Sequence, residues 1–211
     1  MRKWYPWIVV GVTIGFTAAV WNRLPERLPT HWNAEGEVDG WSSRTTAAWM
    51  MPAILVITAL VLPWLPRIDP RRANYEKFRS TYDIAIAGIL SMMAVIHMAV
   101  LGAALGWPIR IERAVPVLIG ALFVLIGNMM PRARSNWLFG IRTPWTLSND
   151  RVWERTHRLG GILFVACGIV LMLVAFAPRQ AVVPMLVAGT TVASIVPLAY
   201  SYFAWKQETS R

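Results

Sequence analysis

Long apolar blocks separated by short polar segments dominate this chain of 211 residues. The blocks cover approximately residues 7–21, 47–65, 84–107, 114–130, 159–177 and 181–205. Most are close to the roughly 20 residues that a helix needs to cross a bilayer, and tilt or bilayer thinning compensates for the shorter first and fourth blocks. The pattern predicts an all-α, polytopic membrane protein with a bundle of six transmembrane helices.

The composition supports a membrane protein. Apolar residues make up 56% of the chain and charged residues 15%, and the mean hydropathy is +0.46, too apolar for a soluble domain of this length. The first apolar run ends in WNRLPERLP without a small-residue cleavage site, so we expect it to remain as a span. The single cysteine, Cys167, excludes an intrachain disulfide.

Lysine and arginine are unequally divided between the two sides. With a cytoplasmic N-terminus, the inner segments hold 15 of these residues and the outer segments hold 6. Short loops follow the positive-inside rule, so both termini are predicted to be cytoplasmic. The net charge of +10 then belongs to the inner surface, where it favours membrane lipids as partners and argues against direct nucleic-acid binding. The second loop, residues 66–83, is interpreted as a basic anchor lying on the headgroups.

Tryptophans mark two loops as candidates for function. Seven of the twelve fall at or near span ends, as an aromatic belt requires: Trp4, Trp7, Trp21, Trp49, Trp64, Trp107 and Trp205. The other five lie in the first outer loop, as Trp32 and Trp41, and between spans four and five, as Trp137, Trp145 and Trp153. A hydrophilic connector has no automatic use for indoles.

The first outer loop, residues 22–46, is predicted to be extended at its prolines and rich in turns near Gly36 and Gly40. Ser42 or Ser43 can cap the second span. Four side chains in this loop could be read as a divalent-metal cluster: His31, Glu35, Glu37 and Asp39. Acidic turns are common in exposed loops, so we favour a plain turn and predict no metal site.

Two polar residues within the spans are candidates for a functional role. His97 is close to the middle of the third, where an ionisable group is by default a functional hypothesis. A neutral imidazole bonded to a neighbouring helix is the structural alternative, which we favour over proton transfer. Asn128 lies near the end of the fourth span.

Residues 131–158, here called the Arg/Trp segment, hold six arginines, three tryptophans and no lysine. Guanidinium groups among indoles suit packing, interfacial seating or anion recognition. The apolar stretch 137–145 is expected to dip into the interface or pack under the bundle, and Ser148 or Asn149 to cap a helix that continues into span five.

That helix is expected to present an ion pair and a basic stripe. Glu154 and Arg158 have the i,i+4 spacing of a pair, and Arg151 and Arg155 extend the stripe. The stripe can serve as snorkelling anchors or as a site for an anionic ligand or a protein partner.

Two motifs carry a family resemblance that covers essentially the whole chain. GNMMPRARSNWLFGIRTPWTLSNDRVWERTHRLGG closely resembles the signature of the SdpI-type family of bacterial integral membrane proteins, and LPTHWNAEGEVDGW resembles the N-terminal module often fused to it. The matching positions are Asn128, Pro131, Asn136, Gly140, Arg142, Thr143, Pro144, Trp145, Trp153, Thr156, His157 and Gly160, with Pro29, His31, Trp32, Asn33, Gly36 and Trp41. We expect a two-span module over residues 1–82 and a four-span SdpI-like module over residues 83–211.

The resemblance implies a multi-pass protein of the bacterial cytoplasmic membrane that protects its cell from a secreted peptide toxin. In the best-known member it also implies that a repressor protein is held at the membrane when toxin is present. The expected partner-binding residues are His31, Trp32, Asn33 and Trp41 outside, and Asn136, Arg142, Trp145, Arg151, Trp153, Arg155 and His157 inside.

A small transporter or lipid-handling protein is the alternative function, with His97 and the Arg/Trp segment on the permeant's route. An enzyme is least expected. The three histidines, His31, His97 and His157, are assigned to the outside, the bilayer middle and the inside, so they cannot form one metal site. No GxSxG, HExxH or phosphate-binding glycine-rich motif is present, and we predict no catalytic residue and no cofactor.

Overall fold

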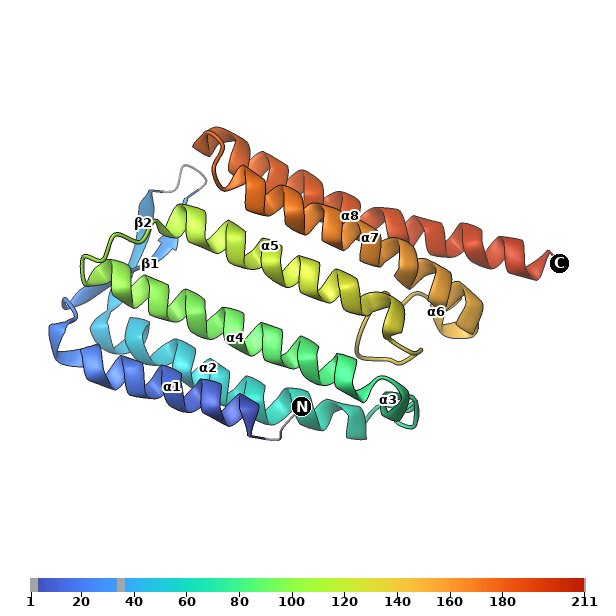
Figure 1. The fold of residues 1–211 in the computed structure, drawn as a ribbon, viewed down its shortest axis with the longest axis horizontal. Coiled ribbons are helices and arrows are strands. Elements are labelled where there is room, and N and C mark those ends of the chain that lie inside the picture. The colour runs from blue at the N-terminus through green and yellow to red at the C-terminus, as the bar shows by residue number, and fades with distance from the viewer. Residues whose placement is uncertain (1–3, 34–36, 211) are drawn as a thin grey trace.

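The computed structural model describes residues 4–33 and 37–210 and consists mainly of long helices (Figure 1). In these residues six helices are long and apolar enough to cross a membrane, as predicted. They are α1 (Tyr5–Val20), α2 (Arg44–Trp64), α4 (Arg79–Ala104), α5 (Ile111–Met129), α7 (Asp150–Val174) and α8 (Arg179–Thr209). Short helices α3 (Asn74–Lys77) and α6 (Pro144–Ser148) lie in the connections. Arg2, Lys3, Glu35, Gly36 and Arg211 lie outside the described residues.

The long helices form two groups of three. Helices α1, α2 and α4 pack together, α7 packs between α5 and α8, and contact of α4 with α5 joins the groups. Each long helix runs opposite to the one before it (Figure 1). Therefore α1 begins and α8 ends on the side of α3 and α6, here called the terminal end, and the opposite side is the hairpin end.

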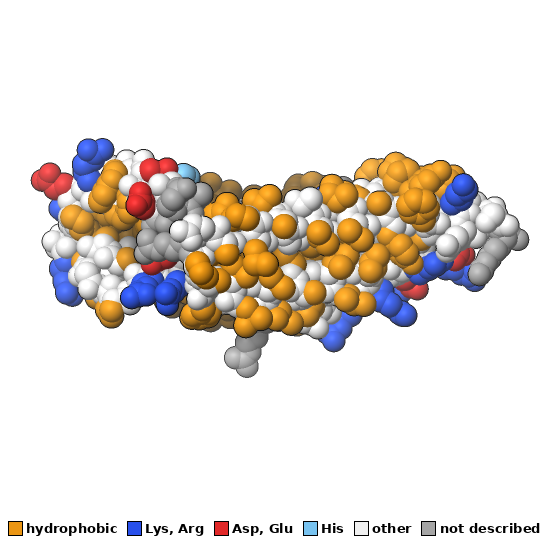
Figure 2. Space-filling view, turned by 90° about the horizontal axis from the view of Figure 1, so that it is seen from above, with side chains coloured by type: hydrophobic (Ala, Val, Ile, Leu, Met, Phe, Trp, Pro, Cys, Tyr) orange, Lys and Arg blue, Asp and Glu red, His pale blue; other side chains and the backbone are white. Residues whose placement is uncertain are grey.

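The surface of the bundle is suited to lipid along its length. Figure 2 shows hydrophobic side chains over the middle of the face it presents, with arginine and lysine gathered towards the two ends. Large apolar side chains such as Ile57, Leu173 and Phe203 are 58–67% exposed. A monomer in water rarely exposes so large an apolar area, and the protein is a multi-pass membrane protein.

Paired glycines bring α5 and α7 into backbone contact. A Cβ on Gly120 would lie 2.5 Å from the carbonyl oxygen of Gly168, and one on Gly127 would lie 2.7 Å from that of Gly161. The glycines are spaced seven residues apart on both antiparallel helices, so they meet twice along one seam. Small residues allow this close approach. Close packing of this kind stabilises helix pairs in lipid, where the hydrophobic effect does not favour their association.

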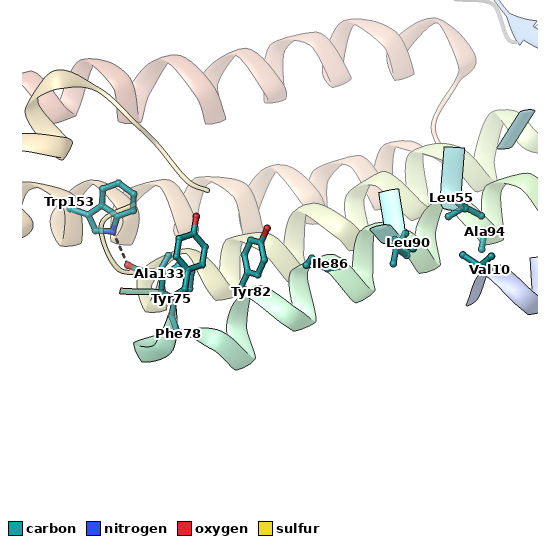
Figure 3. Close-up of a cluster of buried hydrophobic side chains, with 11 residues drawn as sticks. Val10, Leu55, Tyr75, Phe78, Tyr82, Ile86, Leu90, Ala94, Ala133 and Trp153 are labelled. Atoms are coloured by element: carbon teal, nitrogen blue, oxygen red, sulfur yellow. Dashed lines mark hydrogen bonds between the residues drawn. The ribbon is translucent and has the colours of Figure 1, made fainter. Parts of the chain in front are cut away.

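A buried cluster runs from the bundle's middle to its terminal end (Figure 3). It begins with aliphatic side chains such as Leu55 and Leu90 and continues into the rings of Tyr75, Tyr82 and Trp153. The Trp153 indole Nε1 donates to the carbonyl of Ala133 at 2.8 Å, the dashed line in Figure 3. The cluster joins the first group of helices to the Arg/Trp segment.

The loop between α1 and α2, predicted to lie outside, contains an antiparallel hairpin of β1 (Arg27–Trp32) and β2 (Val38–Ser43). Sequence patterning predicted an extended start and turns, and missed the strand pairing. Leu28 is fully buried among residues of α1, α2 and α4, which fixes the hairpin to the bundle. The predicted cap of α2 is confirmed, because the Ser43 side chain accepts from the Thr46 N–H at 3.3 Å.

Candidate functional site

The Arg/Trp segment folds back against the terminal end of the bundle around a fully buried amide, that of Asn136. Its Oδ1 accepts from the backbone N–H groups of Leu138 at 2.9 Å and Phe139 at 2.6 Å. Its Nδ2 donates to the carbonyl oxygens of Arg134 at 2.8 Å and Phe139 at 3.0 Å. This one side chain satisfies the backbone of a buried turn, which explains why an amide is needed there.

The second loop is part of the same site. The Tyr75 hydroxyl lies 2.9 Å from Asp69 Oδ2 and 3.1 Å from Asn136 Oδ1, and the Trp137 N–H donates to Asp69 Oδ2 at 2.8 Å. Burial raises the pKa of the Tyr75 phenol above its usual range, and the hydrogen bond to Asp69 adds to the rise. Arg71 donates to the Ser135 hydroxyl.

Sequence patterning interpreted this loop as a headgroup anchor and did not predict that it packs against the Arg/Trp segment. The available signal was Asp69, an acid close to Arg67, Arg71 and Arg72, and an acid in that setting is commonly a solvated turn residue. Only the fold shows that Asp69 is buried.

His157 is fully buried and has both ring nitrogens engaged. Nδ1 lies 2.9 Å from the carbonyl oxygen of Trp153, and Nε2 accepts from the Ile141 N–H at 2.9 Å. A carbonyl only accepts, so the proton is on Nδ1 and the imidazole is neutral. The ring stacks on Trp153 with centroids 3.9 Å apart. Gly140, at φ +104, passes over it, where a side chain would collide with Nε2.

Helix α6 connects the segment to α8. Thr143 caps α6 with a reciprocal pair of hydrogen bonds to Thr146, and its hydroxyl lies 3.1 Å from that of Ser201 on α8. The Trp145 ring meets Tyr202 edge-on at 5.2 Å. The apolar part of the segment therefore packs under the bundle, one of its two predicted positions, although Trp137 remains 49% exposed.

The basic stripe is partly neutralised by the end of α8. Glu208 lies 3.6 Å from Arg151 and 3.3 Å from Arg155. Glu154 pairs with Arg134 at 2.6 Å, so the predicted pairing of Glu154 with Arg158 was wrong, because a residue distant in sequence competes for the carboxylate. Asn149 accepts from the N–H groups at the start of α7, as predicted.

A cavity of about 400 Å³ lies at the hairpin end. Three of the predicted partner-binding residues line it, His31 and Trp32 from β1 and Asn33 directly after the strand. The start of α5, the connection between α7 and α8, and the first turns of α8 supply the other walls. Its lining includes His31, Trp32, Asn33, Arg110, Arg113, Val115, Pro116, Val182, Val183 and Leu186. Trp41 does not line it and is 53% exposed.

Of the four residues weighed as a metal cluster in the loop between α1 and α2, Glu35 lies outside the described residues. The imidazole Nδ1 of His31 lies 2.5 Å from Asp39 Oδ1. No group of three or more His, Cys, Asp or Glu side chains that could hold a metal occurs among residues 4–33 and 37–210.

The two intramembrane polar residues differ in their surroundings. His97 is buried, and its Nε2 lies 2.9 Å from Thr17 Oγ1 on α1, the helix-to-helix bond that we favoured. The Thr17 hydroxyl donates to the Thr13 carbonyl at 2.8 Å, so His97 Nε2 donates to Thr17. Asn128 is exposed and donates to Val124 of its own helix at 2.9 Å.

Of the inner residues expected to bind a partner, Asn136, Trp153 and His157 are buried and position the segment. Arg142 and Arg151 are exposed at the protein surface, where a partner can contact them. Partner binding by any of these side chains stays a prediction.

Comparisons with known proteins agree with the resemblance described above. Residues 132–201 match the model of the SdpI/YfhL protein family, and residues 8–66 match a domain of unknown function, DUF1648. The chain is 22% identical over 200 residues to Immunity protein SdpI of Bacillus subtilis (strain 168), covering 95% of this chain and 94% of that protein. No solved structure matches. The two matched regions are α1, the hairpin and α2 on one side, and the Arg/Trp segment, α7 and most of α8 on the other.

Proposed function

We propose that this chain, whose residues 132–201 match the model of the SdpI/YfhL protein family, is a non-enzymatic immunity protein of a bacterial cytoplasmic membrane. The toxin would be a secreted peptide that acts on the membrane. The observation that carries this proposal is the cavity at the hairpin end, to whose lining both matched regions contribute together with the start of α5.

The cavity has the chemistry to hold an apolar peptide segment. Its lining includes aliphatic side chains such as Val115, Val182 and Leu186, and Trp32 and Arg113 add an indole and a cation. The charge distribution favours an outer location for this end, where a secreted peptide arrives. We propose that the cavity takes up part of the toxin and so keeps that part out of the bilayer.

Survival of a toxin-sensitive host tests this proposal. Cells producing the wild-type chain should survive membrane-active peptides that kill the parent strain. Trp32→Ala should lower survival at an equal amount of protein in the membrane, whereas Trp41→Ala should not, because Trp41 is on the same hairpin but off the cavity. Unchanged killing of wild-type producers by several such peptides would overturn the immunity role.

We further propose a signalling contact at the terminal end, where a repressor protein would dock. This proposal is supported by Arg142, which is exposed and held by its own bond to the Trp137 carbonyl at 2.6 Å. The half-exposed Trp137 indole lies at the same place. Arg142→Gln should reduce co-purification of the repressor and leave toxin survival unchanged. Equal recovery of the repressor with the wild type and with Arg142→Gln would contradict this second proposal.

A further inference from the structure

A cleft of about 540 Å³ opens between α7 and α8 at the terminal end. The basic stripe of α7 forms one wall with Arg151, Arg155 and Arg158, and α8 contributes Tyr200 and Glu208. It is distinct from the hairpin-end cavity, because none of these residues lines both.

The cleft has an excess of positive charge. The two carboxylates in its lining are already engaged, Glu208 between Arg151 and Arg155 and Glu154 with Arg134. Among the residues that the structure describes, Arg158 has no ion-pair partner, and it is exposed. One guanidinium is therefore available to an anion.

The neighbouring guanidinium is held in place before any ligand arrives. Arg155 donates to Gln207 at 2.9 Å and lies over the Tyr200 ring at 5.9 Å from its centroid. These contacts restrict its side chain, so less rotamer freedom is lost when it binds an anion.

The floor of the cleft becomes apolar one turn after Arg158. Leu159 and Ile162 line it, and Ile162 is 62% exposed on the surface that faces lipid. A cationic rim directly beside a lipid-facing aliphatic groove matches a molecule with an anionic head and an acyl tail.

We propose that this cleft binds an anionic phospholipid, with its phosphate at Arg155 and Arg158 and an acyl chain along Ile162. Guanidinium groups match phosphate oxygens geometrically and remain charged at all relevant pH values. A soluble anion would gain nothing from the apolar groove. The site is independent of the proposed immunity function.

Native mass spectrometry of the purified full-length protein, supplied with phosphatidylglycerol or phosphatidylcholine in mixed micelles, tests the site. The wild type should retain phosphatidylglycerol preferentially. Arg158→Gln should lower the affinity about fivefold, the effect of one cation near an anionic lipid. Arg132→Gln removes the same charge from an exposed residue at the same end of the bundle but outside the cleft, and should leave retention unchanged.

A second variant distinguishes loss of the lipid site from loss of folding. Ile162→Trp fills the apolar groove from an exposed position, keeps every arginine and should also reduce phosphatidylglycerol retention. Equal loss in Arg158→Gln and Arg132→Gln would overturn the proposal by showing only a general charge effect. So would inorganic phosphate at matched concentration displacing the lipid fully, because the acyl chain would then contribute nothing.

Discussion

The imidazole of His157 and the backbone of Ile141 are joined by a 2.9 Å hydrogen bond in which the histidine is the acceptor. Because Nδ1 is already used on the Trp153 carbonyl, this bond requires the neutral ring with its proton on Nδ1. The neutral His157 side chain has one donor and one acceptor, and it uses both to hold the Arg/Trp segment against α7.

His157→Phe should therefore destabilise the protein. A phenyl ring can keep the stacking on Trp153 but leaves the Ile141 N–H buried without an acceptor, which costs about 1–3 kcal/mol. Chemical unfolding in detergent, followed by tryptophan fluorescence, measures the free energy of unfolding. His31→Phe is the control, since that imidazole is exposed and its loss should change stability by less than about 0.5 kcal/mol. Equal stability of His157→Phe and wild type would show that the bond contributes nothing.

The glycine seam between α5 and α7 gives a steric prediction. Gly168→Ala places a Cβ against the Gly120 carbonyl and must push the helices apart, at a cost of about 1–3 kcal/mol. Gly15→Ala on α1 meets nothing within 4 Å and should be neutral or stabilising by up to about 1 kcal/mol. Thermal unfolding of both variants in one detergent compares them. Similar midpoints would mean that the seam is looser than the structure indicates.

The predictable and unpredictable parts of this protein have different physical origins. Six spans followed from apolar runs, because lipid requires about 20 residues per helix, and the cap at Asn149 followed from local hydrogen bonding. The pairing of Arg134 with Glu154, and the burial of Asp69, depend on residues brought together across the sequence. Periodicity carries no information on such contacts.

For the same reason, the sequence predicted only some of the residues that line the hairpin-end cavity. Tryptophan placement identified Trp32, which lines it, but gave Trp41 equal weight. Arg110 directly precedes α5 and Arg113 lies in its first turn, and both line the cavity because α5 begins beside β1. The pairing of the strands places the two tryptophans apart, with Trp32 opposite Val38 and Trp41 opposite Pro29.

The raised pKa of Tyr75 leads us to expect a loss of stability at high pH. Its folded pKa is raised above the ordinary value of 10.0, so below pH 10 both states hold the proton and its contribution is fully present. Above pH 10 the unfolded phenol ionises while the folded one does not, and stability falls as pH rises. Tyr75→Phe should cost about 1 kcal/mol at pH 7, and the deficit should shrink between pH 10 and 11. A deficit that is constant with pH would contradict burial of the hydroxyl.

His97 distinguishes a structural role from the transporter alternative. His97→Ala removes the bond to Thr17 and leaves a cavity between α4 and α1, which should cost about 2–4 kcal/mol. Thr17→Val removes the same bond and keeps the imidazole, so a structural role predicts that this variant is also less stable. Both variants should give ion flux and pH dependence equal to wild type in proteoliposomes, at matched protein content. A changed flux in His97→Ala but not in Thr17→Val would assign the imidazole a part in transport, because both variants lose the bond and only His97→Ala loses the titratable ring.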